Sequence, residues 1–214
     1  MARPAPNIHV AVVEEDVVFL DLNTDSYLCL PGLGRHLRST AAGHWTSADP
    51  AVLNELVDLG LFEAGEPPPP RPWAKPVRSS RSEGAAVRGW RSPFALILTY
   101  ARHGARIKGR TVRRLIERSP NLPLPSTLQA LAAVSRHARL FEHWAPFAPG
   151  QGECLYRAYL LRAYLATQGL GASWVFGVRT WPFAAHCWLQ CGDLVLDDDP
   201  DRVGLYTPIL VISA

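Results

Sequence analysis

The sequence predicts an α+β protein made of two modules. Three short segments rich in β-branched residues precede a helical pattern within the first 64 residues. From residue 93 onward, helical patterns come first and strand patterns follow. A Pro-rich stretch separates these two regions, so we expect a small N-terminal module, a linker and a larger α+β module.

Charge and composition agree with two modules. The chain has 214 residues, of which 48% are hydrophobic, which is enough for a substantial core. Residues 1–62 carry three basic and eight acidic side chains, a net charge of −5, whereas the rest of the chain has a net charge of +8. The basic excess lies mainly between Arg71 and Arg139, without a Gly-rich phosphate loop or an aromatic RNA-binding pattern. We interpret it as a solvated face and expect no nucleic-acid partner.

The sequence lacks the apolar segments that membrane insertion or export requires. No run of about 18 apolar residues is present, so we expect no membrane-spanning helix and no membrane partner. The N-terminus has no long apolar signal region, which favours the cytoplasm. The four cysteines form no C-x-x-C pair, and we expect free thiols, no metal site and no cofactor.

The N-terminal module is predicted to span residues 1–64. Three short strands, separated by turn clusters of acidic, Asn and Ser residues, are expected at 8–13, 17–22 and 26–31. A short helical stretch is expected over residues 33–39. A longer helix begins at Pro50, where Asp49 or Ser47 can accept hydrogen bonds from its first N–H groups. The module is therefore predicted to be winged-helix-like, with three strands and three helices.

A flexible linker is predicted over residues 65–92. This stretch contains six Pro together with Ser, Gly and Arg, and cannot bury enough apolar surface to pack. The second module then spans residues 93–214. Helices are expected at 92–107, at 110–118, from a Ser126 or Thr127 cap to residue 144, and at 153–169. Strands are expected to follow at 173–180, 185–192, 194–200 and 206–212.

Cys154 is the first candidate for chemistry, because it lies at the expected start of a helix. The positive end of the helix dipole and the free backbone N–H groups favour a thiolate, which is the nucleophilic form of cysteine. The same N–H groups can hold an oxyanion. A buried structural cysteine is the alternative, and position alone does not decide between the two.

His186 and an acidic turn follow in an order that suits a catalytic triad. His186 lies on a predicted strand, from which its imidazole can act as a general base toward a thiol at a helix N-terminus. One of Asp197, Asp198 and Asp199 can accept a hydrogen bond from the second ring nitrogen. A half-buried structural histidine and an acidic turn at a strand end are the alternatives. The ordered set of Cys, His and Asp is more specific than any one of them.

The segments "ECLYRAYLLRAYLATQGLGASWVFGVR" and "AHCWLQCGDLVLDDDP" carry a resemblance to known proteins. They resemble the transglutaminase-like, papain-related cysteine peptidases and, more narrowly, the lasso-peptide B proteins, which are the leader peptidases of lasso-peptide biosynthesis. The resemblance implies a papain/transglutaminase-like α+β domain. It also implies Cys154 as nucleophile, His186 as base and Asp198 as the residue that orients the base, with Asp197 and Asp199 as competitors for the third role.

Two positions depart from the pattern of these families. Cys187 places a second thiol directly after the histidine. Gln190 stands where the wider superfamily frequently has a carboxylate. Neither departure removes a member of the triad.

The segment "VVFLDLNTDSYLCLPGLG" resembles the PqqD-like RiPP recognition element, a winged module that binds the leader peptides of ribosomally made precursors. This resemblance implies that an extended leader adds as a further strand to the exposed sheet edge and packs against the last helix. The side chains expected to contact it are Tyr27, Leu28, Cys29, Leu30, Leu53, Leu56 and Val57. The three helix residues among them are equally compatible with the core.

Together, the two resemblances imply a cysteine endopeptidase that binds the leader of a lasso-peptide precursor and cleaves it from the core. They also imply a partner cyclase, similar to asparagine synthetase, that uses ATP to close the lasso ring afterwards. The alternatives are a non-catalytic leader-binding scaffold, an acyl transferase that uses the same triad and a nucleic-acid-binding winged helix. The net negative charge of the N-terminal module disfavours the last of these.

Overall fold

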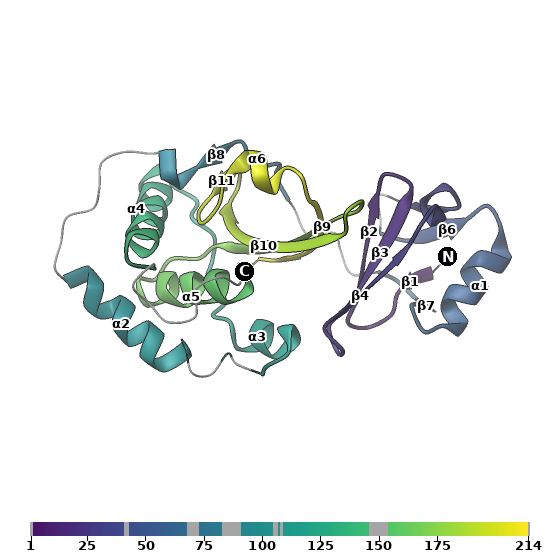
Figure 1. The fold of residues 1–214 in the computed structure, drawn as a ribbon, viewed down its shortest axis with the longest axis horizontal. Coiled ribbons are helices and arrows are strands. Elements are labelled where there is room, and N and C mark those ends of the chain that lie inside the picture. The colour runs from purple at the N-terminus through teal and green to yellow at the C-terminus, as the bar shows by residue number, and fades with distance from the viewer. Residues whose placement is uncertain are drawn as a thin grey trace.

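A computed structural model describes residues 2–40, 43–67, 73–82, 91–104, 107, 109–145 and 154–213, with the side chains of 82 and 91–93 left out. The chain forms an elongated molecule of two lobes (Figure 1). The N-terminal lobe lies at one end, and the helices of the second lobe lie at the other. This mixture of sheets and helices confirms the predicted α+β class.

The N-terminal lobe contains the three predicted strands as an antiparallel sheet in the order β2-β3-β4. They are β2 (Ile8–Val13), β3 (Asp16–Asp21) and β4 (Ser26–Leu30). The central strand β3 is covered on both faces, which explains its unbroken apolar sequence. Val17 and Phe19 pack into the core of the N-terminal lobe, whereas Val18 and Leu20 belong to the core of the second lobe.

A second sheet of the same lobe has the strand order β5-β6-β1-β7. Its strands are β1 (Ala2–Pro4), β5 (Leu37–Ser39), β6 (Trp45–Ser47) and β7 (Phe62–Ala64). The helix α1 (Pro50–Asp58) begins as predicted, because the carboxylate of Asp49 accepts a hydrogen bond from the N–H of Ala51 at 2.9 Å. Its Leu56 side chain is buried in the core of this lobe.

The prediction of a helix over residues 33–39 is wrong. Only a single 3-10 turn, η1 (Leu33–Arg35), forms there, and the chain then enters strand β5. The cause is a contact with a distant residue, since the N–H of Gly34 donates to the carbonyl of Glu15 at 2.8 Å. This bond holds the chain against the turn between β2 and β3. The described part of the lobe therefore has one α-helix instead of three helices.

The second lobe combines helices with a five-stranded sheet in the order β12-β9-β10-β11-β8. The strands are β8 (Arg78–Ser79), β9 (Ser173–Arg179), β10 (Ala184–Cys191), β11 (Leu194–Val195) and β12 (Thr207–Ile212). The helices are α2 (Arg91–His103), α3 (Val112–Arg118), α4 (Leu128–Trp144), α5 (Cys154–Thr167) and the short α6 (Pro200–Val203). Across the described residues, no helix combines the length and apolar character needed to span a membrane.

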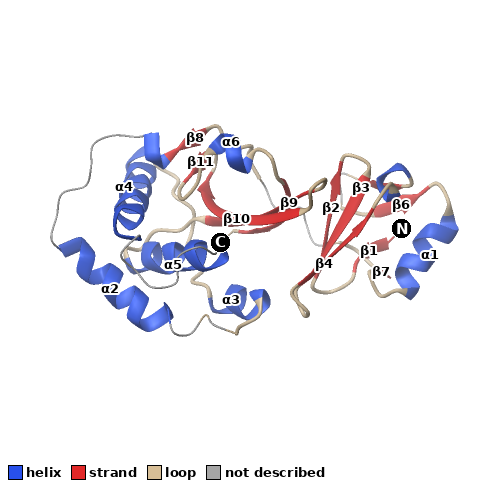
Figure 2. Ribbon diagram, viewed as in Figure 1, coloured by secondary structure: helices blue, strands red, loops and turns tan. Residues whose placement is uncertain are grey.

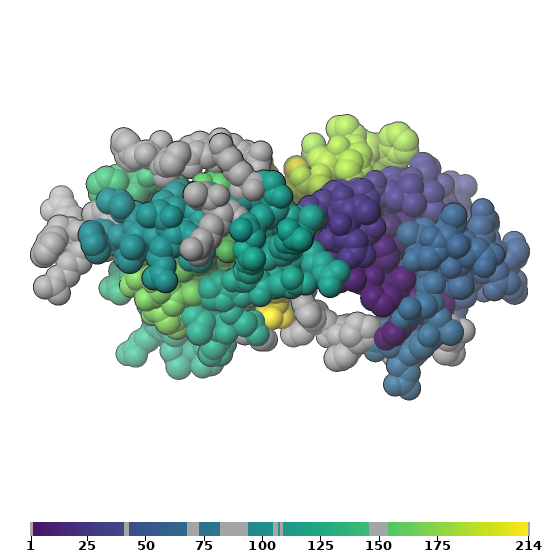
Figure 3. Space-filling view, turned by 90° about the horizontal axis from the view of Figure 1, so that it is seen from below, coloured from purple at the N-terminus to yellow at the C-terminus, as the bar shows by residue number. Residues whose placement is uncertain are grey.

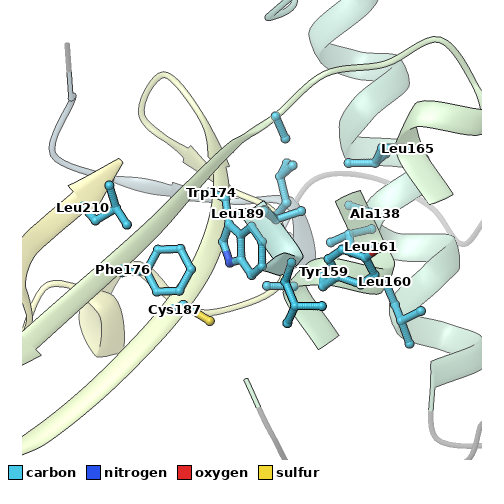
Figure 4. Close-up of a cluster of buried hydrophobic side chains, with 14 of the residues drawn as sticks. Ala138, Tyr159, Leu160, Leu161, Leu165, Trp174, Phe176, Cys187, Leu189 and Leu210 are labelled. Atoms are coloured by element: carbon cyan, nitrogen blue, oxygen red, sulfur yellow. The ribbon is translucent and has the colours of Figure 1, made fainter. Parts of the chain in front are cut away.

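Helix α5 forms the centre of the second lobe. It packs against one face of the sheet, where Tyr159 and Leu160 meet Trp174 and Leu189 in the main core (Figure 4). A smaller cluster around Trp188 fills the opposite face. Because the first residue of this buried helix is Cys154, the core holds the helix start against β10.

The prediction of a flexible linker over residues 65–92 is wrong for its middle part. Arg78–Ser79 forms β8, which pairs in parallel with β11, and η2 (Ser80–Ser82) follows. Both Ser79 and Ser80 are buried. The prediction relied on the low apolar content of the segment. It was wrong here because this part of the segment packs through hydrogen bonds of polar side chains. Residues 68–72 and 83–90 of the expected linker lie outside the described residues.

The two lobes are packed together. Strand β12 lies against β2. The β9–β10 hairpin reaches the N-terminal sheet (Figure 2). At this hairpin, the indole N–H of Trp181 donates to the carboxylate of Asp16 at 2.7 Å. The carboxylate of Asp25 accepts from the N–H of Val112 at the start of α3. Figure 3 shows the surfaces of the two lobes in contact.

Candidate active site

Cys154 lies at the first position of α5, as the sequence predicts. Its side chain is partly buried, and all four cysteines of the chain are free thiols. The N–H groups of the first helical turn have no partner within the helix, and the dipole places partial positive charge at this end. The local structure therefore favours a negative charge at Cys154.

His186 lies on β10 and is held by aromatic neighbours. Its ring stacks on Trp188, with centroids 6.0 Å apart, and lies 5.3 Å from the ring of Tyr206. The residue paired with His186 on β9 is Gly177. A Cβ there would approach the Trp188 ring to 2.9 Å, so only glycine leaves room for this arrangement. His186 is buried, and its orientation is fixed by packing.

The structure brings Asp198 to His186. Its Oδ2 lies 2.6 Å from His186 Nε2, and both residues are buried. Burial alone would raise the pKa of Asp198, but hydrogen bonds from His186 and from the N–H of Asp199 outweigh it and lower that pKa below its usual value. Asp198 is therefore ionised beside the ring.

The two neighbouring aspartates make other contacts. Asp197 accepts a hydrogen bond from the N–H of Leu189 at 2.9 Å, and burial raises the pKa of its carboxyl to about 7. Asp199 caps α6, accepting from the N–H of Asp201 at 2.9 Å. Of the three aspartates that the sequence left as candidates, Asp198 is the one whose carboxylate contacts the histidine.

Cys154 meets both His186 and Cys187 of β10. A hydrogen bond from the Cys187 thiol is the largest cause that lowers the pKa of Cys154 to about 4. Burial opposes this shift, while His186 and the backbone N–H of Cys187 add to it. Burial raises the pKa of Cys187 well above its usual range, so Cys187 remains a thiol and donates. Figure 4 shows its sulfur at the edge of the main core.

The histidine completes an ion pair with Cys154. Burial disfavours the charged ring, but hydrogen bonds to Asp198 and Cys154 outweigh it and raise the pKa of His186 to about 9. Because Nε2 faces Asp198, Nδ1 is the nitrogen left for Cys154. Between about pH 4 and about pH 9 these residues form a thiolate–imidazolium pair. Such a pair combines a nucleophile with a proton donor.

The comparisons with known proteins agree with this geometry. Residues 95–211, more than half of the chain, match the family model of the transglutaminase-like superfamily. The chain belongs to this superfamily. Proteins of the transglutaminase-like superfamily are typically cysteine-protease-like.

A curated relative provides a narrower similarity. The chain is 37% identical over 51 residues to the microcin J25-processing protein McjB of Escherichia coli. The matched region covers 24% of each protein, so the chain spans about a quarter of the length of this relative. No solved structure matches the chain.

Within the transglutaminase-like domain, Gln190 has a structural role. Its Oε1 accepts from the indole N–H of Trp188 at 2.8 Å, and its Nε2 donates to the carbonyls of Ala74 and Gly192. A carboxylate at this position could accept the first bond but could not donate the other two. Gln190, which departs from the family pattern, therefore ties the segment before β8 to β10.

The expected peptide-binding residues of β4 fall into three groups. On β4, Tyr27 and Cys29 pack against the main core, and the Tyr27 ring lies 5.7 Å from that of Phe183. Leu28 is 44% exposed. On the opposite face, Leu30 packs against the N-terminal core.

The helix residues of that set also separate. Leu56 is 3% exposed and is a core residue, so it cannot contact a peptide in this conformation. Leu53 packs against the same core and remains partly exposed, whereas Val57 is 39% exposed. In the described part of the chain, β4 pairs with β3 alone, which leaves its other edge available.

Sequence reasoning missed the donor role of Cys187, which it noted only as a second thiol. It also missed Glu142, Arg157 and Arg81, which surround the backbone of Asp197. Arg157 lies one turn after Cys154 on the same helix, but no spacing rule marks it as part of a site. These contacts depend on tertiary structure.

Proposed function

We propose that this protein is a cysteine endopeptidase of lasso-peptide biosynthesis. It binds the leader of a ribosomally made precursor in the cytoplasm and cleaves it from the core before a cyclase similar to asparagine synthetase closes the ring. The observation that carries the proposal is the buried contact of 2.6 Å between His186 and Asp198 beside the Cys154 thiol. Superfamily membership and the partial similarity to McjB support it.

The charges of the site suit a two-step hydrolysis. The Cys154 thiolate attacks the scissile carbonyl, and N–H groups at the start of α5 stabilise the oxyanion. His186 then gives a proton to the leaving amine, and the acyl-enzyme forms. His186 next takes a proton from water, which attacks the thioester and releases the leader. Asp198 holds the ring and stabilises its charged form throughout.

In this proposal, residues 1–64 recognise the leader and residues 93–214 hold the peptidase site. The leader adds as a strand to the free edge of β4, where Leu28 is exposed. We propose Leu53 and Val57 of α1 as further contacts with the leader, because both side chains remain at least partly exposed. Tyr27 and Cys29 instead support the contact between the lobes.

The first test is labelling of each cysteine with iodoacetamide across pH, read by mass spectrometry. Wild type is compared with His186→Ala and with His143→Ala, which removes an exposed histidine. We expect Cys154 to react far below the ordinary thiol pKa of about 8.5, and to lose this reactivity only in His186→Ala. If Cys154 is inert or titrates as an ordinary thiol, the protein is a leader-binding scaffold instead.

The second test uses the precursor peptide, which we expect a neighbouring gene to encode. The full-length protein should release leader and core, and Cys154→Ser should not. Hydrolysis adds water to the products, whereas acyl transfer joins the leader to an added amine. The mass of the leader fragment, measured with and without glycine methyl ester, therefore distinguishes a peptidase from an acyl transferase.

A further inference from the structure

The segment that connects the two lobes contacts the loop that carries Asp198. Three successive side chains of the segment donate hydrogen bonds to three successive backbone carbonyls: Ser80 Oγ to Leu196 at 2.7 Å, Arg81 Nη2 to Asp197 at 2.9 Å and Ser79 Oγ to Asp198 at 3.0 Å. We call Ser79, Ser80 and Arg81 the clamp residues. The two serines are 5% and 0% exposed, so their hydroxyls are shielded from water and committed to these carbonyls.

Two further residues extend the clamp to the helix of Cys154. Arg157 of α5 donates to the same Asp197 carbonyl that accepts from Arg81. Both guanidinium groups also bind the carboxylate of Glu142 on α4, at 2.6 Å each. The carboxylate of Glu142 thus holds both guanidinium groups against the Asp197 carbonyl. This contact lies between the helix of Cys154 and the loop of Asp198. Charge-assisted bonds of this kind are short and directional.

We propose that the clamp residues position Asp198 for its contact with His186. The position of the Asp198 side chain depends on the position of its backbone. The clamp residues donate to the backbone carbonyls of Asp198 and of the two residues before it. The segment between the lobes thus contributes to the geometry of the site. Arg81 is a positioning residue, since it acts through the backbone of Asp197 and not on substrate. This inference rests on the proposed roles of Cys154, His186 and Asp198.

The clamp has a consequence for the ion pair. If the loop moves, Asp198 holds the His186 imidazolium less well, and the Cys154 thiolate loses part of its stabilisation. The apparent pKa for alkylation of Cys154 then rises. The experiment is iodoacetamide labelling from pH 3 to 10 on full-length wild type, Arg81→Ala, Arg81→Lys and Ser79→Ala/Arg81→Ala.

We expect the double variant to raise the apparent pKa by about one unit, which lowers the labelling rate at pH 3 by ~10-fold. Arg81→Ala should give a smaller shift, and Arg81→Lys should recover part of it because it keeps a donor and a positive charge. The matched control is Arg78→Ala, which removes a guanidinium from the same segment where it pairs with exposed Asp193. Labelling of the buried Cys191 reports any general unfolding.

The outcomes separate the two proposals. If wild-type Cys154 titrates like an ordinary thiol, the proposed function fails. If wild type shows the low pKa but the folded double variant keeps the same profile, the clamp proposal is wrong. It is also wrong if Arg78→Ala shifts the profile as much as Arg81→Ala does. Should the double variant label at Cys191, the single Arg81 variants decide, because that side chain is 42% exposed and leaves no core cavity.

Discussion

The Cys187 thiol donates a hydrogen bond to Cys154, and this is the largest cause of the low pKa of Cys154. We expect Cys187→Ala to raise the pKa of Cys154 from about 4 by at least about one unit, because the thiolate loses a donor. Labelling with iodoacetamide across pH measures the change. Cys187→Ser keeps a hydroxyl donor and should lie closer to wild type. An unchanged profile in Cys187→Ala would show that the backbone N–H and His186 suffice.

Peptide cleavage should have a bell-shaped dependence on pH. Below about pH 4 the Cys154 thiolate takes up a proton, and above about pH 9 His186 loses the proton that the leaving amine needs. We expect kcat/KM for precursor cleavage to fall about tenfold per pH unit beyond each limit. A profile that continues to rise above pH 9 would exclude His186 as the proton donor.

Asp198→Asn should weaken catalysis through the histidine. The amide keeps a similar shape but loses the negative charge, so the pKa of His186 falls and the ion pair with Cys154 is weakened. We expect kcat/KM to fall by about 10²–10⁴-fold at pH 7. The control is Asp199→Asn, since Asn also caps a helix and Asp199 does not face the ring. Equal losses of kcat/KM in both variants would show that the Asp198 carboxylate has no particular role in orienting His186.

Asp197 gives the folded protein a pH-dependent stability. Its pKa is about 7 when folded, well above the ordinary value of 3.8 for an aspartate, because burial disfavours the carboxylate. The folded state therefore binds a proton that the unfolded state has lost, and stability falls as pH rises from about 4 through about 7. Asp197→Asn should remove this loss, which is at most about 4 kcal/mol.

Thermal unfolding at pH 5 and pH 8 checks this expectation. The Tm of Asp197→Asn relative to wild type should be higher at pH 8 than at pH 5. The exposed Asp201→Asn serves as the control and should show no such difference. If the relative Tm of Asp197→Asn is the same at both pH values, Asp197 is ionised throughout this range.

Features that depend on neighbouring residues were predictable from the sequence. The cap Asp49 accepts from the first turn of its helix, and the three strands before residue 31 follow from β-branched segments and turns. The order of Cys154 and His186 along a helix and the following strands was also accessible, because such elements tend to pack in sequence.

Features that depend on distant contacts were not predictable. The strand at Leu37–Ser39 replaces a helix because Glu15 holds the preceding turn. Arg78–Ser79 becomes a strand because its partners lie more than a hundred residues later. Likewise, three consecutive aspartates are equivalent in sequence, and only the tertiary structure directs Asp198 to His186.

The packing of the lobes fixes the distance between the free edge of β4 and Cys154. Val18 and Leu20 of β3 share a core with α5, and Trp181 binds Asp16, so the edge of β4 and the thiol of Cys154 are fixed at one separation. A precursor held on β4 would have to span that distance with a set number of residues. Cleavage would then be placed by counting from the bound segment. Residues inserted directly before the junction would leave the cut at its original count, within the insertion.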